Sequence, residues 1–254
     1  MSKLEALIFD VDGTLADTER DGHRVAFNMA FEEYKLDWHW DEDLYEKLLE
    51  VTGGKERMAY YLDHFHTDYP QDDSTPALIV ELHQAKTRHY TELLAEGAIP
   101  LRTGIRRLID EARNQGMRLA IATTTTPANV TALLEPSLAP GSCDWFEVIA
   151  AGDIVPDKKP APDIYVYALE KMGLPAEACM AFEDSENGIK SSLGANLKTI
   201  ITINGYTEHH NFEGASLVLD SMGEPNQPFN ILKGSNHGFS YLNMDMIRKV
   251  FEEN

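Results

Sequence analysis

The sequence predicts an α/β fold: a doubly wound, Rossmann-like parallel sheet with a helical domain inserted into it. Short, nearly continuous apolar runs alternate with helical patterns, which is typical of parallel strands covered by helices on both faces. Between residues 18 and 97, helical patterns follow one another with no strand candidate. We therefore predict an α/β core domain of residues 1–17 and 98–254, which includes a C-terminal extension, and a helical cap domain of residues 18–97.

Five apolar runs are the expected strands of the core, and helices connect them. The segment GIRRLIDEARNQG, residues 104–116, keeps its apolar side chains on one face and ends at Gly116, as a crossover helix with a left-handed cap does. The segment GEPNQP, residues 223–228, is typical of a linker, and an amphipathic helix is expected around residues 243–252. The strands are expected at residues 5–9, 117–122, 147–151, 179–183 and 198–203.

Composition excludes several classes of function. The 254 residues include 22 basic and 42 acidic side chains, and this formal charge of −20 argues against a nucleic-acid or anionic-membrane partner. An anionic small molecule held by local cations and a metal remains compatible with it. No basic and apolar leader follows Met1, and no apolar stretch approaches the length of a membrane span, so we expect a cytoplasmic protein. Only Cys143 and Cys179 are present, which does not indicate a disulfide framework.

Acidic, hydroxyl and basic side chains lie where the expected strands end. Open parallel sheets bind ligands at the carboxyl ends of their strands. Each feature has an ordinary explanation when taken singly: a fragment of a calcium loop, the polar end of a strand, a solvated turn or a helix N-cap. Together and in this order they predict one site. They are Asp10 and Asp12 in IFDVDGTLAD, Thr123 at the head of a run of four threonines, Lys159 in DKKPAPD, and Glu183 and Asp184 in FEDSENG.

This set of residues fits phosphoryl transfer through an aspartyl-phosphate. Mg²⁺ takes hard oxygen ligands, and it offsets the charges of a carboxylate nucleophile and of a phosphate ester. We assign Asp10 as nucleophile and metal ligand, and Asp12 as the acid and base, with its backbone carbonyl facing the metal. The Thr123 hydroxyl and the backbone amides after it would hold phosphoryl oxygens, while Lys159 would neutralise charge in the transition state. The expected metal-binding residues are Asp10, Asp12, Glu183 and Asp184.

The motifs DVDGT, the strand-end threonine, KKP and EDS resemble the four motifs of the haloacid dehalogenase superfamily of phosphatases and phosphomutases, over residues 4 to about 222. The chain is similar to the β-phosphoglucomutase-like subgroup, whose helical cap follows the first motif. The segments DTERDGHRVAFN, HQAKT and VIAAGDIVPDKKPAPDIY resemble the CbbY-type phosphatases, which remove xylulose 1,5-bisphosphate, an inhibitor of the carbon-fixing carboxylase. The resemblance implies the strand order 3-2-1-4-5. Relative to the phosphoglucomutase pattern, TERDGH carries one extra residue before His23.

The cap should decide the substrate, because the core motifs define only the phosphoryl chemistry. Lys55 and Arg57 follow a glycine pair in TGGKER, residues 52–57, and either grip a second phosphate or form the solvated first turn of a helix. Lys86 lies at helical spacing with an apolar stripe, and in the resembling family the corresponding lysine reaches the active site. The residues assigned to substrate binding are Asp17, His23, Gly54, Lys55, Arg57, Lys86, Thr124 and Thr125.

Three functions of different classes remain open at this point. A magnesium-dependent phosphatase acting on a small sugar phosphate, with xylulose 1,5-bisphosphate as the favoured substrate, is the first. A sugar phosphomutase would use the same Asp10 and Asp12 and return the phosphoryl group to a bisphosphate intermediate. A non-enzymatic receiver-like module is least favoured, because it expects a shorter chain without a cap. The expected partner is a small sugar phosphate or bisphosphate, with no nucleic acid and no membrane, and the expected state is a monomer.

Overall fold

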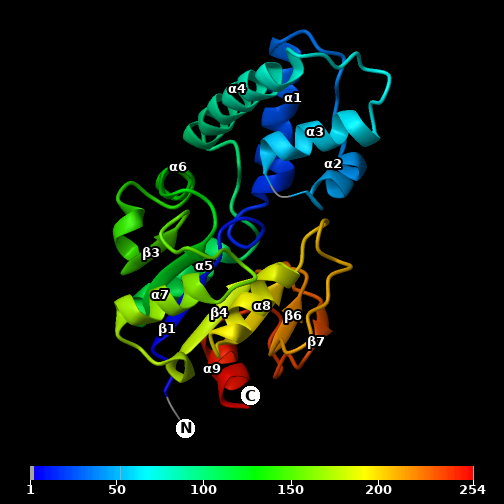
Figure 1. Ribbon diagram of the computed structural model, residues 1–254. Helices are drawn as coiled ribbons and strands as arrows, with labels where there is room; N and C mark the ends of the chain where they lie inside the picture. The colour runs from blue at the N-terminus through cyan, green and yellow to red at the C-terminus, as the bar shows by residue number, and fades with distance from the viewer. Residues whose placement is uncertain (1–2, 52, 254) are drawn as a thin grey trace. The chain divides into compact units, whose positions relative to one another are not determined.

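A seven-stranded sheet is the centre of the α/β part of the structure (Figure 1). The computed structural model describes residues 3–51 and 53–253. The strand order is β3-β2-β1-β4-β5-β6-β7, and neighbouring strands are parallel except for the antiparallel pair of β6 and β7. The predicted fold class and the order 3-2-1-4-5 are therefore confirmed for five strands. They are β1 (Ala6–Phe9), β2 (Arg118–Thr123), β3 (Val148–Ala151), β4 (Cys179–Glu183) and β5 (Lys198–Thr202).

Two further strands that the sequence did not predict extend the sheet beyond β5. They are β6 (Leu217–Leu219) and β7 (Ile231–Lys233), each of three residues. A strand of three residues is too short to show a periodic pattern, and it is stabilised mainly by hydrogen bonds to the strand beside it. The C-terminal extension therefore begins by completing the edge of the sheet.

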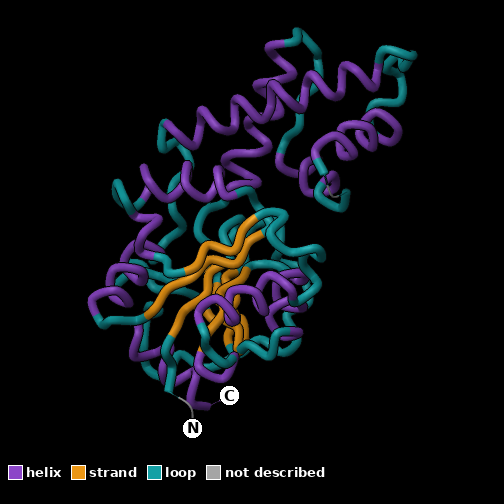
Figure 2. The backbone as a smooth tube through the Cα atoms, turned by 60° about the vertical axis from the view of Figure 1, so that its left-hand side comes forward, coloured by secondary structure: helices purple, strands orange, loops and turns teal. Residues whose placement is uncertain are grey.

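The chain separates into two compact units, Met1–Asp17 with Pro100–Asn254, and Thr18–Ile99. Within the described residues of Thr18–Ile99 there are helices and loops but no strand, as the colours of Figure 2 show. No helix in the described stretches of either unit combines the length and apolar character needed to cross a membrane. The helices of Thr18–Ile99 are the π-helix η1 (Glu19–His23), α1 (Arg24–Glu33), α2 (Glu42–Leu48), α3 (Gly54–His64) and α4 (Thr75–Ala95).

Helices connect the strands of the α/β unit. Helix α5 begins after Gly104 and is followed by Gly116, two glycines with positive φ of 86° and 70°, as the pattern of this segment predicts. The expected C-terminal helix is present as α9, one residue later in the chain than predicted. The helices are α5 (Ile105–Asn114), α6 (Pro127–Ser137), α7 (Asp163–Met172), α8 (Glu186–Gly194), α9 (Met244–Glu253), and the short 3₁₀ helices η2 (Ser142–Trp145) and η3 (Ala176–Ala178).

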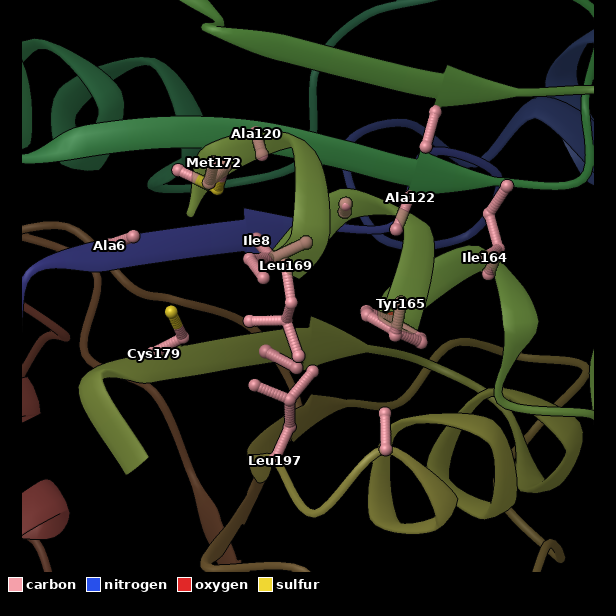
Figure 3. Packing of buried hydrophobic residues seen from close by; sticks show 14 residues of the cluster. Ala6, Ile8, Ala120, Ala122, Ile164, Tyr165, Leu169, Met172, Cys179 and Leu197 are labelled. Carbon is pink, nitrogen blue, oxygen red and sulfur yellow. The ribbon is translucent and has the colours of Figure 1, made fainter. Parts of the chain in front are cut away.

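Strand β1 is buried on both faces of the sheet. Ala6 and Ile8 belong to an apolar cluster with residues of α7, which Figure 3 shows from close by. Strand side chains alternate between faces, so Phe9 points to the opposite side, where its ring stacks on Phe182 with centroids 4.6 Å apart. Packing on both faces fixes the register of each strand relative to its neighbours. It thereby fixes the positions of the residues that follow the strand ends.

Candidate active site

Three buried carboxylates meet at the carboxyl ends of β1 and β4. The two strands are parallel neighbours in which Phe9 is paired with Phe182. The next residues, Asp10 and Glu183, therefore lie side by side at the ends of the two strands. The backbone N–H of Asp10 also donates to the Phe182 carbonyl at 3.0 Å. One carboxylate oxygen each from Asp10, Glu183 and Asp184 lies within 4.8 Å of the others. The structure therefore brings together three of the four residues assigned to the metal.

Lys159 binds two of these carboxylates. Its ammonium donates to Asp10 Oδ1 at 2.7 Å, to Glu183 Oε1 at 2.6 Å and to the Ala122 carbonyl at 2.8 Å, which uses all three of its donors. Lys158, by contrast, is exposed and pairs with Asp153 at 2.8 Å. Burial alone would lower the pKa of Lys159, but the charges of Asp10 and Glu183 outweigh burial and raise it, so the side chain is a cation at neutral pH.

The carboxylates carry more negative charge than one lysine offsets. Burial, reinforced by the charge of Asp10 and opposed by Lys159, raises the pKa of Glu183 to about 7. Burial also raises the pKa of Asp184 well above its usual range, and the charges of Asp10 and Glu183 act in the same direction. A cluster of hard oxygen donors with surplus negative charge fits Mg²⁺, which would relieve the repulsion between the carboxylates.

Two glycines allow the backbone to approach these carboxylates. Gly13 has a φ of +83°, and a Cβ atom on it would lie 2.2 Å from Asp184 Oδ2. Gly188, in the first turn of α8, would place a Cβ atom 1.8 Å from Glu183 Oε2. Any side chain larger than hydrogen at the glycine of DVDGT or at that of EDSENG would therefore clash with a carboxylate of the site.

Asp12 is half-buried in the turn that follows β1. The group of three carboxylates that could hold a metal among the described residues does not include it. Its backbone forms an isolated bridge with Ala16, which closes the turn after β1. The assignment of Asp12 as acid and base stays a prediction.

The four threonines of residues 123–126 lie in different environments. Thr123 is buried at the end of β2, and its Oγ1 accepts from the backbone N–H of Thr125 at 3.3 Å. Thr125 is also buried, and its Oγ1 accepts from the side chain of Asn129 at 3.2 Å. Thr124 is exposed, whereas Thr126 caps α6. Thr123 is thus the threonine that the strand end itself positions.

Asp17 forms an ion pair with Arg102, whose Nε lies 3.1 Å from Asp17 Oδ1. The guanidinium of Arg102 also donates to the carbonyls of Thr202 at 2.9 Å and Asp220 at 3.2 Å, and to the carbonyls of Gly13 and Ile203. Asp17 therefore anchors a residue that ties the loop after β1 to the end of β5. Its assignment to substrate binding stays a prediction.

In the helical unit, Arg57 is buried and bound to protein groups. It donates to the Tyr45 hydroxyl at 2.7 Å and to the carbonyls of Leu48 and Val51 at 3.1 and 3.4 Å. The Tyr45 hydroxyl in turn donates to Glu19 at 2.6 Å. These contacts give Arg57 a supporting role in the unit, and its assignment to phosphate binding stays a prediction.

Lys86 and His23 form a second polar pair, in which Lys86 is buried and His23 is half-buried. Lys86 Nζ lies 3.0 Å from His23 Nδ1 and 4.9 Å from the centre of the Phe27 ring. Burial, followed by the charge of Lys86, lowers the pKa of His23 to about 3, so the imidazole is neutral. His23 ends the π-helix η1, and a π-helical turn accommodates one more residue than an α-helical turn, which explains how the extra residue of TERDGH fits.

The remaining predicted residues of the helical unit lie around the start of α3. Gly54 is the first residue of α3 and is half-buried, and a Cβ atom on it would lie 2.8 Å from the His83 ring. Lys55 is exposed in the first turn of that helix. Thr52, the first residue of the TGGKER segment, lies outside the described residues.

Sequence reasoning missed two residues that bind the carboxylates. The Tyr165 hydroxyl donates to Glu183 Oε1 at 2.6 Å, and the Asn204 side chain donates to Asp184 Oδ2 at 2.7 Å. Tyr165 stands in the apolar pattern of α7, and Asn204 follows β5 as an ordinary loop residue. Neither position carries a local signal, because only the tertiary fold brings these side chains to the cluster.

A model of the haloacid dehalogenase-like hydrolases matches residues 4–196 of the chain. The chain belongs to this family. It is an enzyme, and its activity is that of a phosphatase, as the motifs predicted. Protein CbbY from Cupriavidus necator is 48% identical to this hydrolase over 228 residues, which cover 89% of this chain and 88% of the relative.

Solved structures agree with this membership. CbbY from Rhodobacter sphaeroides, in crystals with phosphate and as a variant in complex with xylulose-(1,5)bisphosphate, is 47% identical to this hydrolase with a TM-score of 0.72. The match covers 86% of this chain and 94% of that one. A β-phosphoglucomutase from Clostridium difficile, 21% identical, has a TM-score of 0.66 and covers 98% of each chain, which shows a shared fold.

Proposed function

We propose that this hydrolase removes a phosphate group from a small sugar bisphosphate, with xylulose 1,5-bisphosphate as the substrate. The observation that carries the proposal is the contact between Asp10 and Lys159 within a buried group of carboxylates. The 47% identity to a protein crystallised with that bisphosphate supports the choice of substrate. On the argument from the sequence, the reaction takes place in the cytoplasm.

In the proposed reaction the carboxylate of Asp10 attacks phosphorus. The bond from phosphorus to the sugar oxygen breaks, and Asp12 gives the leaving oxygen a proton. Asp12 then takes a proton from the water that cleaves the aspartyl-phosphate, which releases phosphate and restores Asp10. Lys159 neutralises charge on the transferring group, and the Thr123 hydroxyl with the backbone N–H groups after it holds the phosphoryl oxygens.

Mg²⁺ is the proposed cofactor, and when bound it would offset the charges of the carboxylates and the phosphoryl group. Asp10, Asp184 and the backbone carbonyl of Asp12 would hold it. Glu183 belongs to the same buried group. Its Oε1 accepts from Lys159 and Tyr165, and its Oε2 accepts from the backbone N–H of Asp184 at 3.3 Å, so direct metal binding by Glu183 would compete with these contacts.

Substrate recognition is proposed to use residues of the helical unit, chiefly Lys86, His23 and Arg57, with Lys55 and Gly54 at the start of α3. The core motifs supply cations for one phosphate, whereas a bisphosphate has two. Lys86 and Arg57 are the two buried cations among the described residues of that unit, and buried cations recognise phosphate more strongly than solvated ones.

The test is phosphate release from a panel of sugar monophosphates and bisphosphates, with Mg²⁺ and with a chelator in place of it. We expect turnover only with Mg²⁺, and the highest kcat/KM with xylulose 1,5-bisphosphate. Isomerisation of hexose 1-phosphates without phosphate release would replace the phosphatase by a phosphomutase. Full turnover after exhaustive removal of metal would contradict the proposed role of Asp184.

A further inference from the structure

We propose that Asn204 is a positioning residue for the metal site: it holds one oxygen of Asp184 and thereby directs the other oxygen toward the cation. The inference rests on the proposed use of Mg²⁺. It concerns a residue outside the four motifs, in the loop that follows β5.

The orientation of the Asn204 amide is set by its neighbours. Its Oδ1 accepts from the backbone N–H of Tyr206 at 3.0 Å, so the oxygen and nitrogen of the amide are distinguishable. Its Nδ2 therefore faces the carboxylate and donates to Asp184 Oδ2 at 2.7 Å. One side chain thus links the backbone of the loop to a carboxylate assigned to the metal.

The backbone of Asn204 is held in place as well. Its N–H donates to the hydroxyl of Thr207 at 3.0 Å, and its carbonyl accepts from the Thr207 N–H at 3.0 Å. Thr207 is buried, and the preceding residue, Ile203, donates to the Leu219 carbonyl at 2.9 Å. The donor to Asp184 is therefore carried on a fixed turn rather than on a free loop.

Gly13 packs against both Asp184 and Asn204. A Cβ atom on Gly13 would lie 2.2 Å from Asp184 Oδ2 and 2.8 Å from Asn204 Nδ2. The oxygen that Asn204 binds is thus the one pressed against the turn that follows Asp12. Hydrogen bonds to ligating carboxylates fix their orientation, and loss of such a partner typically costs about 10- to 100-fold in metal affinity or activity.

The experiment compares Asn204→Leu with Thr207→Val in the full chain. The Leu variant keeps the size of the side chain but loses the donor to Asp184, whereas the Val variant loosens the same turn and keeps that donor. Without substrate, bound Mg²⁺ is measured by equilibrium dialysis against increasing Mg²⁺ concentration, and the concentration that half-saturates the protein is the Mg²⁺ midpoint. The melting temperature is recorded without metal. The Mg²⁺ concentration for half-maximal turnover and the KM for the bisphosphate are measured in parallel.

We expect the Mg²⁺ midpoint of Asn204→Leu to rise by about 10-fold or more, while KM at saturating Mg²⁺ keeps its wild-type value. Thr207→Val should lower the melting temperature in the absence of metal and leave the Mg²⁺ midpoint at the wild-type value. If Asn204→Leu does not fold, Asn204→Ala is measured in its place with the same expectation.

A wild-type Mg²⁺ midpoint in the Asn204 variants, or an equal rise in Thr207→Val, would overturn the positioning role and leave the proposed function intact. A wild-type protein that shows no Mg²⁺ midpoint and turns over without metal would overturn both.

Discussion

Lys159 Nζ lies 2.7 Å from Asp10 Oδ1, although the two residues are 149 positions apart in the sequence. The contact places a cation against the proposed nucleophile before any substrate arrives. The same ammonium binds Glu183 Oε1 and the Ala122 carbonyl, so the strand ends of β1, β2 and β4 meet at one side chain. Removal of that side chain should therefore affect chemistry and packing together.

Lys159→Ala should lower kcat by about 10²- to 10³-fold, because loss of a preorganised donor to developing charge costs about that much. Lys158→Ala is the matched control, since Lys158 is exposed and forms an ion pair with Asp153 on the surface. Turnover of the bisphosphate and circular dichroism are measured for both. Equal, small losses in the two variants would show that the lysine pair is only a solvated turn.

Asp10→Asn should abolish turnover without changing the fold, because it removes the nucleophile and a proposed metal ligand at constant volume. Asp12→Asn should retain substrate binding and lose the proton transfers, which typically contribute about 10²- to 10⁴-fold. Single-turnover phosphate release separates the two variants. A loss of only several-fold in Asp12→Asn would remove that residue from its assigned role.

The five central strands could be predicted from the apolar runs, because a parallel strand that is buried on both faces has a nearly continuous apolar sequence. Their order was implied by the family resemblance. Strands β6 and β7 could not be predicted from pattern, since they are short and lie at the edge. The meeting of Asp10, Glu183 and Lys159 was predictable from their positions after the strands and from the motif resemblance.

Residues that act through others were not predictable. Tyr165 was part of an apolar helix pattern, and Asn204 and Arg102 had no spacing that connects them to the motifs. Each takes its role from a distant partner: Tyr165 from Glu183, and Asn204 from Asp184. The local sequence indicates which side chains follow a strand. The residues that hydrogen-bond to those side chains come from distant segments, so they depend on the tertiary fold.

His23 should make the protein less stable in acid. Burial, followed by the charge of Lys86, lowers its pKa in the folded state to about 3, below the ordinary value of 6.5. Between these two values the unfolded chain binds a proton that the folded chain does not, so the free energy of unfolding decreases as the pH falls through 6.5 toward 3. The contribution amounts to about 1.4 kcal/mol for each pH unit within that window.

His23→Asn keeps an acceptor near Lys86 and removes the titration, so its stability should fall less steeply than that of the wild type between pH 6.5 and pH 4. Urea unfolding at several pH values measures the difference. His64→Asn, on the exposed end of α3, is the control and should follow the wild-type slope. Parallel slopes for His23→Asn and the wild type would contradict the neutral state of this imidazole in the folded protein.

Arg57 has two possible roles that substitution can separate. Its guanidinium supports the helical unit through Tyr45, and it is one of the residues proposed to bind the second phosphate. Charge-assisted hydrogen bonds to phosphate contribute about 1.5–3 kcal/mol, so Arg57→Ala should lower kcat/KM for xylulose 1,5-bisphosphate by about 10-fold or more. The decrease in kcat/KM for a sugar monophosphate should be smaller, so the preference of the enzyme for the bisphosphate over the monophosphate should become weaker.

Tyr45→Phe separates the two readings, since it removes the hydroxyl that Arg57 binds and leaves the guanidinium in place. If Arg57 binds phosphate, Tyr45→Phe lowers the melting temperature but keeps the preference for the bisphosphate over the monophosphate. If the arginine only supports the helical unit, Arg57→Ala and Tyr45→Phe change kcat/KM for both substrates in the same proportion. The ratio of kcat/KM for the two substrates therefore decides between them, whatever each variant costs in stability.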